Sequence, residues 1–154
     1  MRKNTLMISI VAAMTLWIIP AAHAQSGNEP VNTEDVKRET QELIGTLQKY
    51  SAKQRGEALK EADLAIKKLD ERIDGLETRA DNNWDDLTQS AREKTKANLK
   101  ALRKQRNELA EAYGSFKSSS AGAWEQMRKG FSDAYQSLSE SWEEAVNEYE
   151  SGNK

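Results

Sequence analysis

The sequence AWEQMRKGFSDAYQSLSESWEEAVNEYE, residues 123–150, places large apolar side chains at helical spacing near the C-terminus. At about 100° per residue these side chains fall on one narrow stripe of a helix. The stripe consists of Trp124, Met127, Phe131, Tyr135, Leu138, Trp142, Val146 and Tyr149. The opposite face of this helix is acidic. We therefore expect one amphipathic helix whose stripe requires a partner surface.

The stripe belongs to a register that covers most of the chain. Every eleventh residue is apolar at these positions: Val36, Leu47, Ala58, Leu69, Ala80, Ala91, Leu102, Tyr113, Trp124, Tyr135 and Val146. An eleven-residue repeat has about 3.67 residues per turn, which keeps the stripe straight or slightly right-handed. No proline follows Pro30, strong helix formers dominate, and no run alternates every two residues. The sequence therefore predicts an all-α chain.

Two stretches are candidates for breaks in the helices. The first is Asp81-Asn82-Asn83 followed by Trp84-Asp85-Asp86, where Asn83 is a candidate cap of a new helix. The second is the Ser/Gly-rich stretch from Gly114 to Gly122. They are either turns or kinks in a longer helix, and the unbroken register favours kinks.

A long helix with one apolar stripe must fold back on itself or oligomerise. We expect residues 33–150 to form one domain of long amphipathic helices, which pack as an antiparallel coiled-coil hairpin or a three-helix bundle. Thr33 is expected to cap the first helix, because two carboxylates follow it. Residues 25–32 are expected to be a disordered polar lead, and residues 151–154 a tail.

Charges are segregated along the chain. Seven basic residues lie between positions 92 and 106, with acidic stretches on both sides, and they form a basic face: Arg92, Lys94, Lys96, Lys100, Arg103, Lys104 and Arg106. A basic helix between acidic ones suits an antiparallel bundle, so we expect a salt-bridged, solvated face. Contact with anionic lipid or a polyanion is the alternative. No aromatic residue interrupts the basic run, which argues against nucleic acid as a partner. The acidic clusters lack a calcium-binding loop and are interpreted as solvated faces.

The N-terminus has the features of a secretory signal peptide. Arg2 and Lys3 precede an apolar run from Leu6 to Ile19, and Ala22-His23-Ala24 resembles a cleavage site. The apolar run is shorter than the roughly 20 residues of a membrane span. We expect cleavage after Ala24 and export to the periplasm. Without Arg2 and Lys3, 21 of the 23 basic residues remain against 25 acidic ones, a net charge of −4.

The composition argues against catalysis. The chain has no cysteine, and its one histidine, His23, lies in the expected signal peptide. Cys–His and Ser–His–Asp chemistry and ordinary zinc or copper sites need these residues. We therefore expect no enzyme activity, no cofactor, no metal site and no small-molecule substrate.

The segment LKALRKQRNELAEAYGSFKSSSAGAWEQMRKGFSDAYQSLSESWEEA, from Leu99 to Ala145, resembles a family of small bacterial stress-response proteins, which are helical with predicted coiled coils. The matching features are LKALRxQRxxLA, AWE, KGFxxAYxxL and the final Trp142 before acids. The resemblance implies an association with envelope stress and supplies no site residues. The eleven-residue repeat is also similar to that of apolipoprotein-type amphipathic helices.

Three interpretations of the aromatic stripe remain open. It seals the core of a bundle or oligomer, it occupies a groove on a target protein, or it lies on a lipid surface. Our leading hypothesis is a non-enzymatic exported protein that acts by protein–protein contact, or by self-association, in an envelope stress response. The alternative is a peripheral protein that makes weak contact with a membrane surface. The acidic face opposite the stripe disfavours the lipid interpretation.

Overall fold

The computed structural model describes residues 32–152, which form four α-helices and two short 3-10 turns. The helices are α1 (Thr33–Leu47), α2 (Arg55–Asn82), α3 (Gln89–Ser118) and α4 (Trp124–Gly152), and the 3-10 turns are Ala52–Gln54 and Trp84–Asp86. No strand occurs in this range, so the all-α prediction is confirmed. The expected signal peptide, its cleavage site after Ala24 and the lead up to residue 31 lie outside the described residues.

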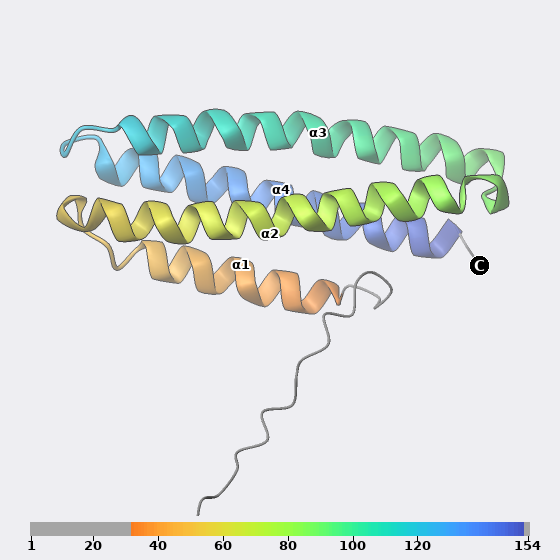
Figure 1. Ribbon diagram of the computed structural model, residues 1–154, viewed down its shortest axis with the longest axis horizontal. Helices are drawn as coiled ribbons and strands as arrows, with labels where there is room; N and C mark the ends of the chain where they lie inside the picture. Colours follow the sequence, from red (N-terminus) through yellow and green to blue (C-terminus); the bar gives the residue numbers. More distant parts are fainter. Residues whose placement is uncertain (1–31, 153–154) are drawn as a thin grey trace, which may run out of the picture.

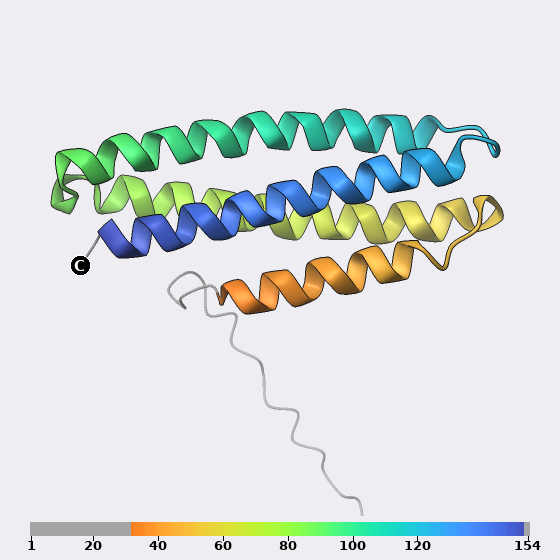
Figure 2. The ribbon, with the colours of Figure 1, turned by 180° about the vertical axis from the view of Figure 1, so that it is seen from behind.

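Consecutive helices run antiparallel, up and down along one long axis (Figure 1). Helices α2 and α4 lie in the middle, with α3 on one side of the pair and α1 on the other (Figures 1 and 2). Helix α1 has 15 residues, whereas α2, α3 and α4 have 28, 30 and 29. The molecule is therefore an antiparallel four-helix bundle whose first helix is about half as long as the others, so the expected hairpin or three-helix bundle has one helix too few.

Caps at the helix starts differ from the expected ones. Asn32, not Thr33, caps α1, because its side-chain oxygen accepts a hydrogen bond from the Glu34 amide at 3.1 Å. Asn83 ends α2 and precedes the 3-10 turn Trp84–Asp86, but its side chain makes no capping hydrogen bond there. Thr88 caps α3, since its hydroxyl accepts a hydrogen bond from the Ala91 amide at 3.2 Å.

The two expected breaks are turns, not kinks. The chain reverses over residues 83–88 and again over residues 119–123. Gly114 itself lies inside α3, which continues to Ser118. A third reversal, over residues 48–54, was not expected, because this stretch consists mainly of helix formers.

The eleven-residue register describes the core of the bundle. Of its eleven positions ten are buried, and Tyr113 is half-buried. The register holds across all three turns, although each turn reverses the chain direction. Each helix therefore turns the same stripe toward the common interior.

Candidate functional site

The aromatic stripe of α4 is a packing surface. Seven of its eight residues are buried, and Met127 is half-buried. Aromatic residues of α3 meet it: the Phe116 ring centroid lies 4.7 Å from that of Trp124 and 5.6 Å from that of Phe131. The Tyr113 ring centroid lies 6.0 Å from that of Phe131. These distances are typical of favourable aromatic pairs. We call Tyr113, Phe116, Trp124, Phe131 and Tyr135 the aromatic cluster.

The polar tips of the stripe bind backbone carbonyl groups of neighbouring segments. The Tyr149 hydroxyl donates to the Arg79 carbonyl at 2.9 Å, and the Tyr135 hydroxyl donates to the Ala65 carbonyl at 3.3 Å. Burial raises the pKa of Tyr135 to about 12, an effect that Arg72 opposes. The Trp142 indole is fully buried, and its N–H has no hydrogen-bond partner among residues 32–152. The stripe thus ties α4 to α2 by hydrogen bonds as well as by packing.

The basic face is divided among several partners. Lys94 pairs with Glu148 of α4 at 2.5 Å, and Arg103 pairs with Glu77 of α2 at 2.7 Å. Arg106 also binds α2, through Asp70, and this pair raises the pKa of the Arg106 guanidinium. Residues of α3 therefore form ion pairs with both neighbours, as the charge segregation indicated.

The other members of the basic face bind locally or face solvent. Arg92 donates to the Asp85 carbonyl at 3.0 Å and lies over the Trp84 ring. Lys104 pairs with Glu108 on its own helix at 3.3 Å. Lys96 and Lys100 are exposed, without an ion pair within the described range. An exposed ion pair such as that of Lys104 and Glu108 adds little to stability.

Helix α1 meets the bundle through a contact that we call the α1 seam, formed with α2 and α4. Its buried residues are Val36, Thr40, Leu43 and Leu47. The buried hydroxyls of Thr40 and Ser139 lie 3.0 Å apart, within hydrogen-bond distance. On the α2 side, Arg72 binds Glu39 at 2.9 Å. The seam is short and contains buried polar contacts where the α3–α4 contact contains aromatic rings.

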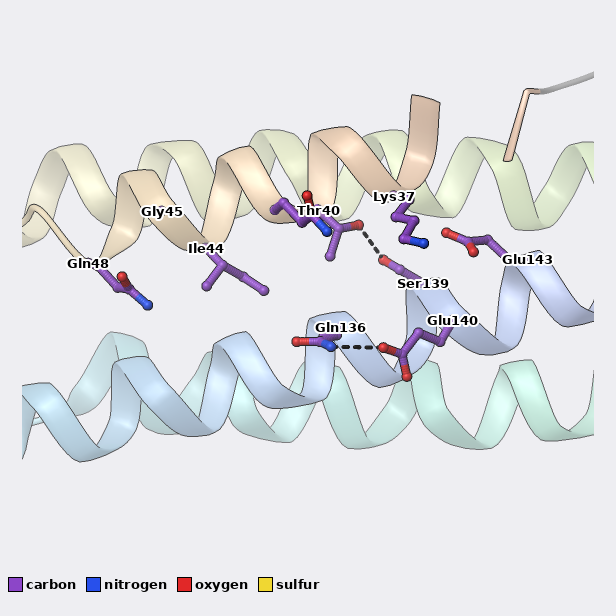
Figure 3. A pocket seen from close by; sticks show the side chains of 10 residues that line it. Lys37, Thr40, Ile44, Gly45, Gln48, Gln136, Ser139, Glu140 and Glu143 are labelled. Carbon is purple, nitrogen blue, oxygen red and sulfur yellow. Dashed lines mark hydrogen bonds between the residues drawn. The ribbon is translucent and has the colours of Figure 1, made fainter. Parts of the chain in front are cut away.

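A groove of about 520 Å³ runs along the outer side of the α1 seam (Figure 3). Thr40 and Ser139 lie at its centre, and Lys37 and Glu143 point toward one another across it (Figure 3). Burial raises the pKa of Glu143, and the positive charge of Lys37 opposes this shift. Ile44 contributes a half-buried apolar side chain to the groove. The lining is mixed in character, without a concentration of one charge.

The turn between α1 and α2 is held by the first residues of α4. The Trp124 indole N–H donates to the Tyr50 carbonyl at 3.0 Å. The Arg128 guanidinium donates to the Gln48 carbonyl at 3.2 Å and to the Tyr50 carbonyl at 3.4 Å. We call the side chains of Trp124 and Arg128 the turn clamp. They bind carbonyl groups that helix hydrogen bonds leave free at the end of α1.

The sequence indicated candidate sites on α4 and on the basic face, whereas in α1 it indicated only an expected cap and two register positions. One signal was present: Thr40 lies at helical spacing among Val36, Leu43 and Leu47, and is thus a polar residue within an apolar stripe. Its partner Ser139 follows the stripe residue Leu138. The two residues lie 99 positions apart in the sequence, so their contact could not be predicted without knowledge of the turns.

In the described part of the chain, no group of three or more His, Cys, Asp or Glu side chains is arranged to hold a metal ion. None of the helices between residues 32 and 152 combines the length and the hydrophobicity of a membrane span. In comparisons with models of protein families, with curated proteins and with solved structures, the chain matched nothing. The candidate site is therefore defined by geometry alone, and it is the α1 seam.

Proposed function

We propose that this chain is an exported, non-enzymatic helical protein that acts by protein–protein contact in an envelope stress response. The contact surface is the face of α2 and α4 that α1 covers, which we call the α2–α4 groove. It is distinct from the open groove between α1 and α4. The observation that carries the proposal is the α1 seam: a helix of 15 residues lies on a bundle of much longer helices through partly polar contacts. A partner's amphipathic helix binds in the place of α1.

The seam indicates what a partner helix needs. The partner helix must supply three apolar side chains at the spacing of Val36, Leu43 and Leu47. The partner helix must also supply a carboxylate opposite Arg72, at the place where the Glu39 carboxylate now lies 2.9 Å from the Arg72 guanidinium. Lys68 adds a second positive charge, 3.7 Å from the same carboxylate. The preferred partner is thus an acidic amphipathic helix of about four turns.

Helix α1 suits such an exchange because it is the shortest of the four helices. Isolated helices shorter than about 12–15 residues are marginal in water. Its removal exposes the apolar residues that it covers on α2 and α4, and a partner helix covers them again. The export and stress parts of the proposal rest on the N-terminal 24 residues and on the resemblance of Leu99–Ala145 to stress-response proteins.

Site-specific photo-crosslinking in intact cells tests this proposal. Leu64 is the large hydrophobic residue with the greatest exposure in the described range, at 48%, and it lies beside the α1–α2 contact. A photoreactive residue at position 64 is expected to capture a partner protein. The same residue at the exposed position Ser115 of α3 is the control and captures none.

A disulfide between α1 and α4 makes the test specific. The pair Thr40→Cys and Ser139→Cys replaces two hydroxyls that lie 3.0 Å apart, and an oxidising compartment permits the bond to form. With α1 fixed, capture at position 64 is expected to disappear. Capture that persists with the disulfide formed contradicts the proposed surface.

Lipid binding is the second candidate function, and the eleven-residue register favours it. Because ten of the eleven positions are buried in one core, an opened chain displays them as one continuous apolar stripe. Tryptophan fluorescence with anionic and neutral vesicles tests this candidate. A blue shift of emission together with co-sedimentation supports lipid binding, and the absence of both eliminates it.

A further inference from the structure

The connection between α1 and α2 differs in composition from the other two turns. Residues 48–54 read QKYSAKQ and contain mainly good helix formers, with neither glycine nor proline. The other turns contain Asn, Asp and Thr (residues 83–88) or Ser and Gly (residues 119–123), which favour turns and caps. The first turn is therefore the one with the weakest turn signal of its own, since only the capping box of Ser51 and Gln54 marks it.

A helix drawn through this turn keeps the apolar stripe in register. Leu47 and Ala58 lie eleven residues apart, which corresponds to about three full turns of helix. Tyr50, now half-buried against the core, falls on the stripe between them. Residues 33–82 can thus form one continuous helix, about 75 Å long, with the apolar residues of α1 and α2 on one side.

The folded turn is held partly from outside its own sequence. In a continuous helix, the Gln48 and Tyr50 carbonyls accept hydrogen bonds from amides four residues further along. In the bundle these carbonyls accept hydrogen bonds from the turn clamp, Trp124 and Arg128. A local capping box between Ser51 and Gln54 adds to this. Release of the clamp therefore favours the straight helix.

We propose that α1 exchanges between two copies of this chain. Residues 48–54 straighten, and the α1 of each copy docks in the α2–α4 groove of the other. The groove fits α1 already, so the Arg72–Glu39 ion pair and the Thr40–Ser139 contact form again between the copies. Such a swap is an inexpensive route to a symmetric dimer, because no new surface is needed.

This inference shares with the proposed function only the departure of α1 from its groove; it names a second copy as the occupant. A second copy is favoured because the groove binds α1 through contacts that the chain itself supplies. It is also favoured because the straightened connection directs α1 away from its own bundle. Exchange depends on protein concentration by mass action.

Disulfide exchange between two singly substituted chains tests the proposal directly. Thr40→Cys and Ser139→Cys chains are mixed at high concentration, incubated and then oxidised. A swapped dimer places position 40 of one chain beside position 139 of the other, and mass spectrometry is expected to identify this mixed disulfide. A closed monomer cannot form it. Its absence, with the mixture monomeric by light scattering over about a hundredfold range of concentration, overturns the proposal.

Substitutions in the turn sharpen the test. Ala52→Pro is compatible with the folded turn, because Ala52 is the first residue of a 3-10 turn and follows Ser51 in extended conformation. Inside a continuous helix the same proline is strongly unfavourable, so the dimer association constant is expected to fall by more than about a hundredfold. Ala52→Ser is the matched control and leaves the constant nearly unchanged.

The clamp variants act in the opposite direction. Trp124→Phe keeps most of the packing but removes the N–H that binds Tyr50, and Arg128→Met removes the second donor. Each is expected to raise the association constant by about tenfold. Dimers that are insensitive to Ala52→Pro contradict the swap. Photo-capture of another protein at position 64 is scored separately, so either idea can fail alone.

Discussion

Helix α4 has two contrasting faces. Toward α3 it presents aromatic rings, with Phe131 and Phe116 stacked at 5.6 Å. The backbones are also close, since a side chain at Gly152 would meet the Ala91 methyl group at 3.0 Å. Toward α1 it presents buried serines, with Ser139 at 3.0 Å from Thr40. One helix thus combines an extensive apolar contact with a smaller, partly polar one.

The difference teaches where this fold is stable and where it can open. Burial of an aromatic side chain contributes about 1.5–3 kcal/mol, whereas a neutral hydrogen bond contributes about 1 kcal/mol. The aromatic cluster therefore belongs to the part that unfolds only globally. The α1 seam is expected to belong to the part that opens first.

The largest expected effect concerns the aromatic cluster. Phe131→Ala removes a fully buried ring and leaves a cavity between α3 and α4, so the free energy of unfolding is expected to fall by about 3–5 kcal/mol. Urea denaturation measures this loss. Phe131→Leu is the control and loses less, because it leaves a smaller cavity. A loss below about 1 kcal/mol for Phe131→Ala would falsify the description of this contact as the stable one.

The next effect concerns Tyr135, whose pKa is raised to about 12 chiefly by burial. The fold favours the neutral phenol, so its stabilisation is complete below the ordinary pKa of about 10 and is lost as the pH rises through about 12. The loss amounts to about 2–3 kcal/mol. Urea denaturation between about pH 8 and pH 12 measures it, and the loss attributable to this phenol is the part that Tyr135→Phe removes. Identical pH profiles for the two chains contradict the assignment.

The smallest effect concerns the hydroxyl pair of the α1 seam. Thr40→Val leaves the buried Ser139 hydroxyl without this partner, so a loss of about 1 kcal/mol is expected. The double variant with Ser139→Ala removes both hydroxyls and is expected to approach the stability of the parent chain. A double-mutant cycle measures the coupling. If the double variant is as destabilised as the sum of the single variants, the two hydroxyls are not coupled.

The α4 stripe and its burial could be predicted from the sequence, because large apolar residues at a regular spacing leave few alternatives. The turn near Asn83 could be located from its Asn and Asp residues, although the cap was placed at Asn83 instead of Thr88. Both features depend on short stretches of the chain. Local chemistry is sufficient for them.

The turn at residues 48–54 was missed, although Ser51 and Gln54 have the spacing of a capping box, which is a local signal of a helix start. Most of its residues favour a helix, and the other groups that hold it are Trp124 and Arg128, which lie 74 and 80 residues away from their acceptors Tyr50 and Gln48. The same distance concealed the α1 seam as a candidate site. Contacts remote in sequence therefore decided the number of helices, whereas the periodicity decided what each helix buries.

Native-state hydrogen exchange tests the central claim that α1 opens separately from the bundle. Amide protons of α1, such as that of Leu43, are expected to exchange through an opening whose free energy lies several kcal/mol below that of global unfolding. Core amides of α3 and α4, such as those of Leu109 and Leu138, are expected to exchange only through global unfolding. Equal opening free energies for all four helices, with the same dependence on denaturant, would contradict the account.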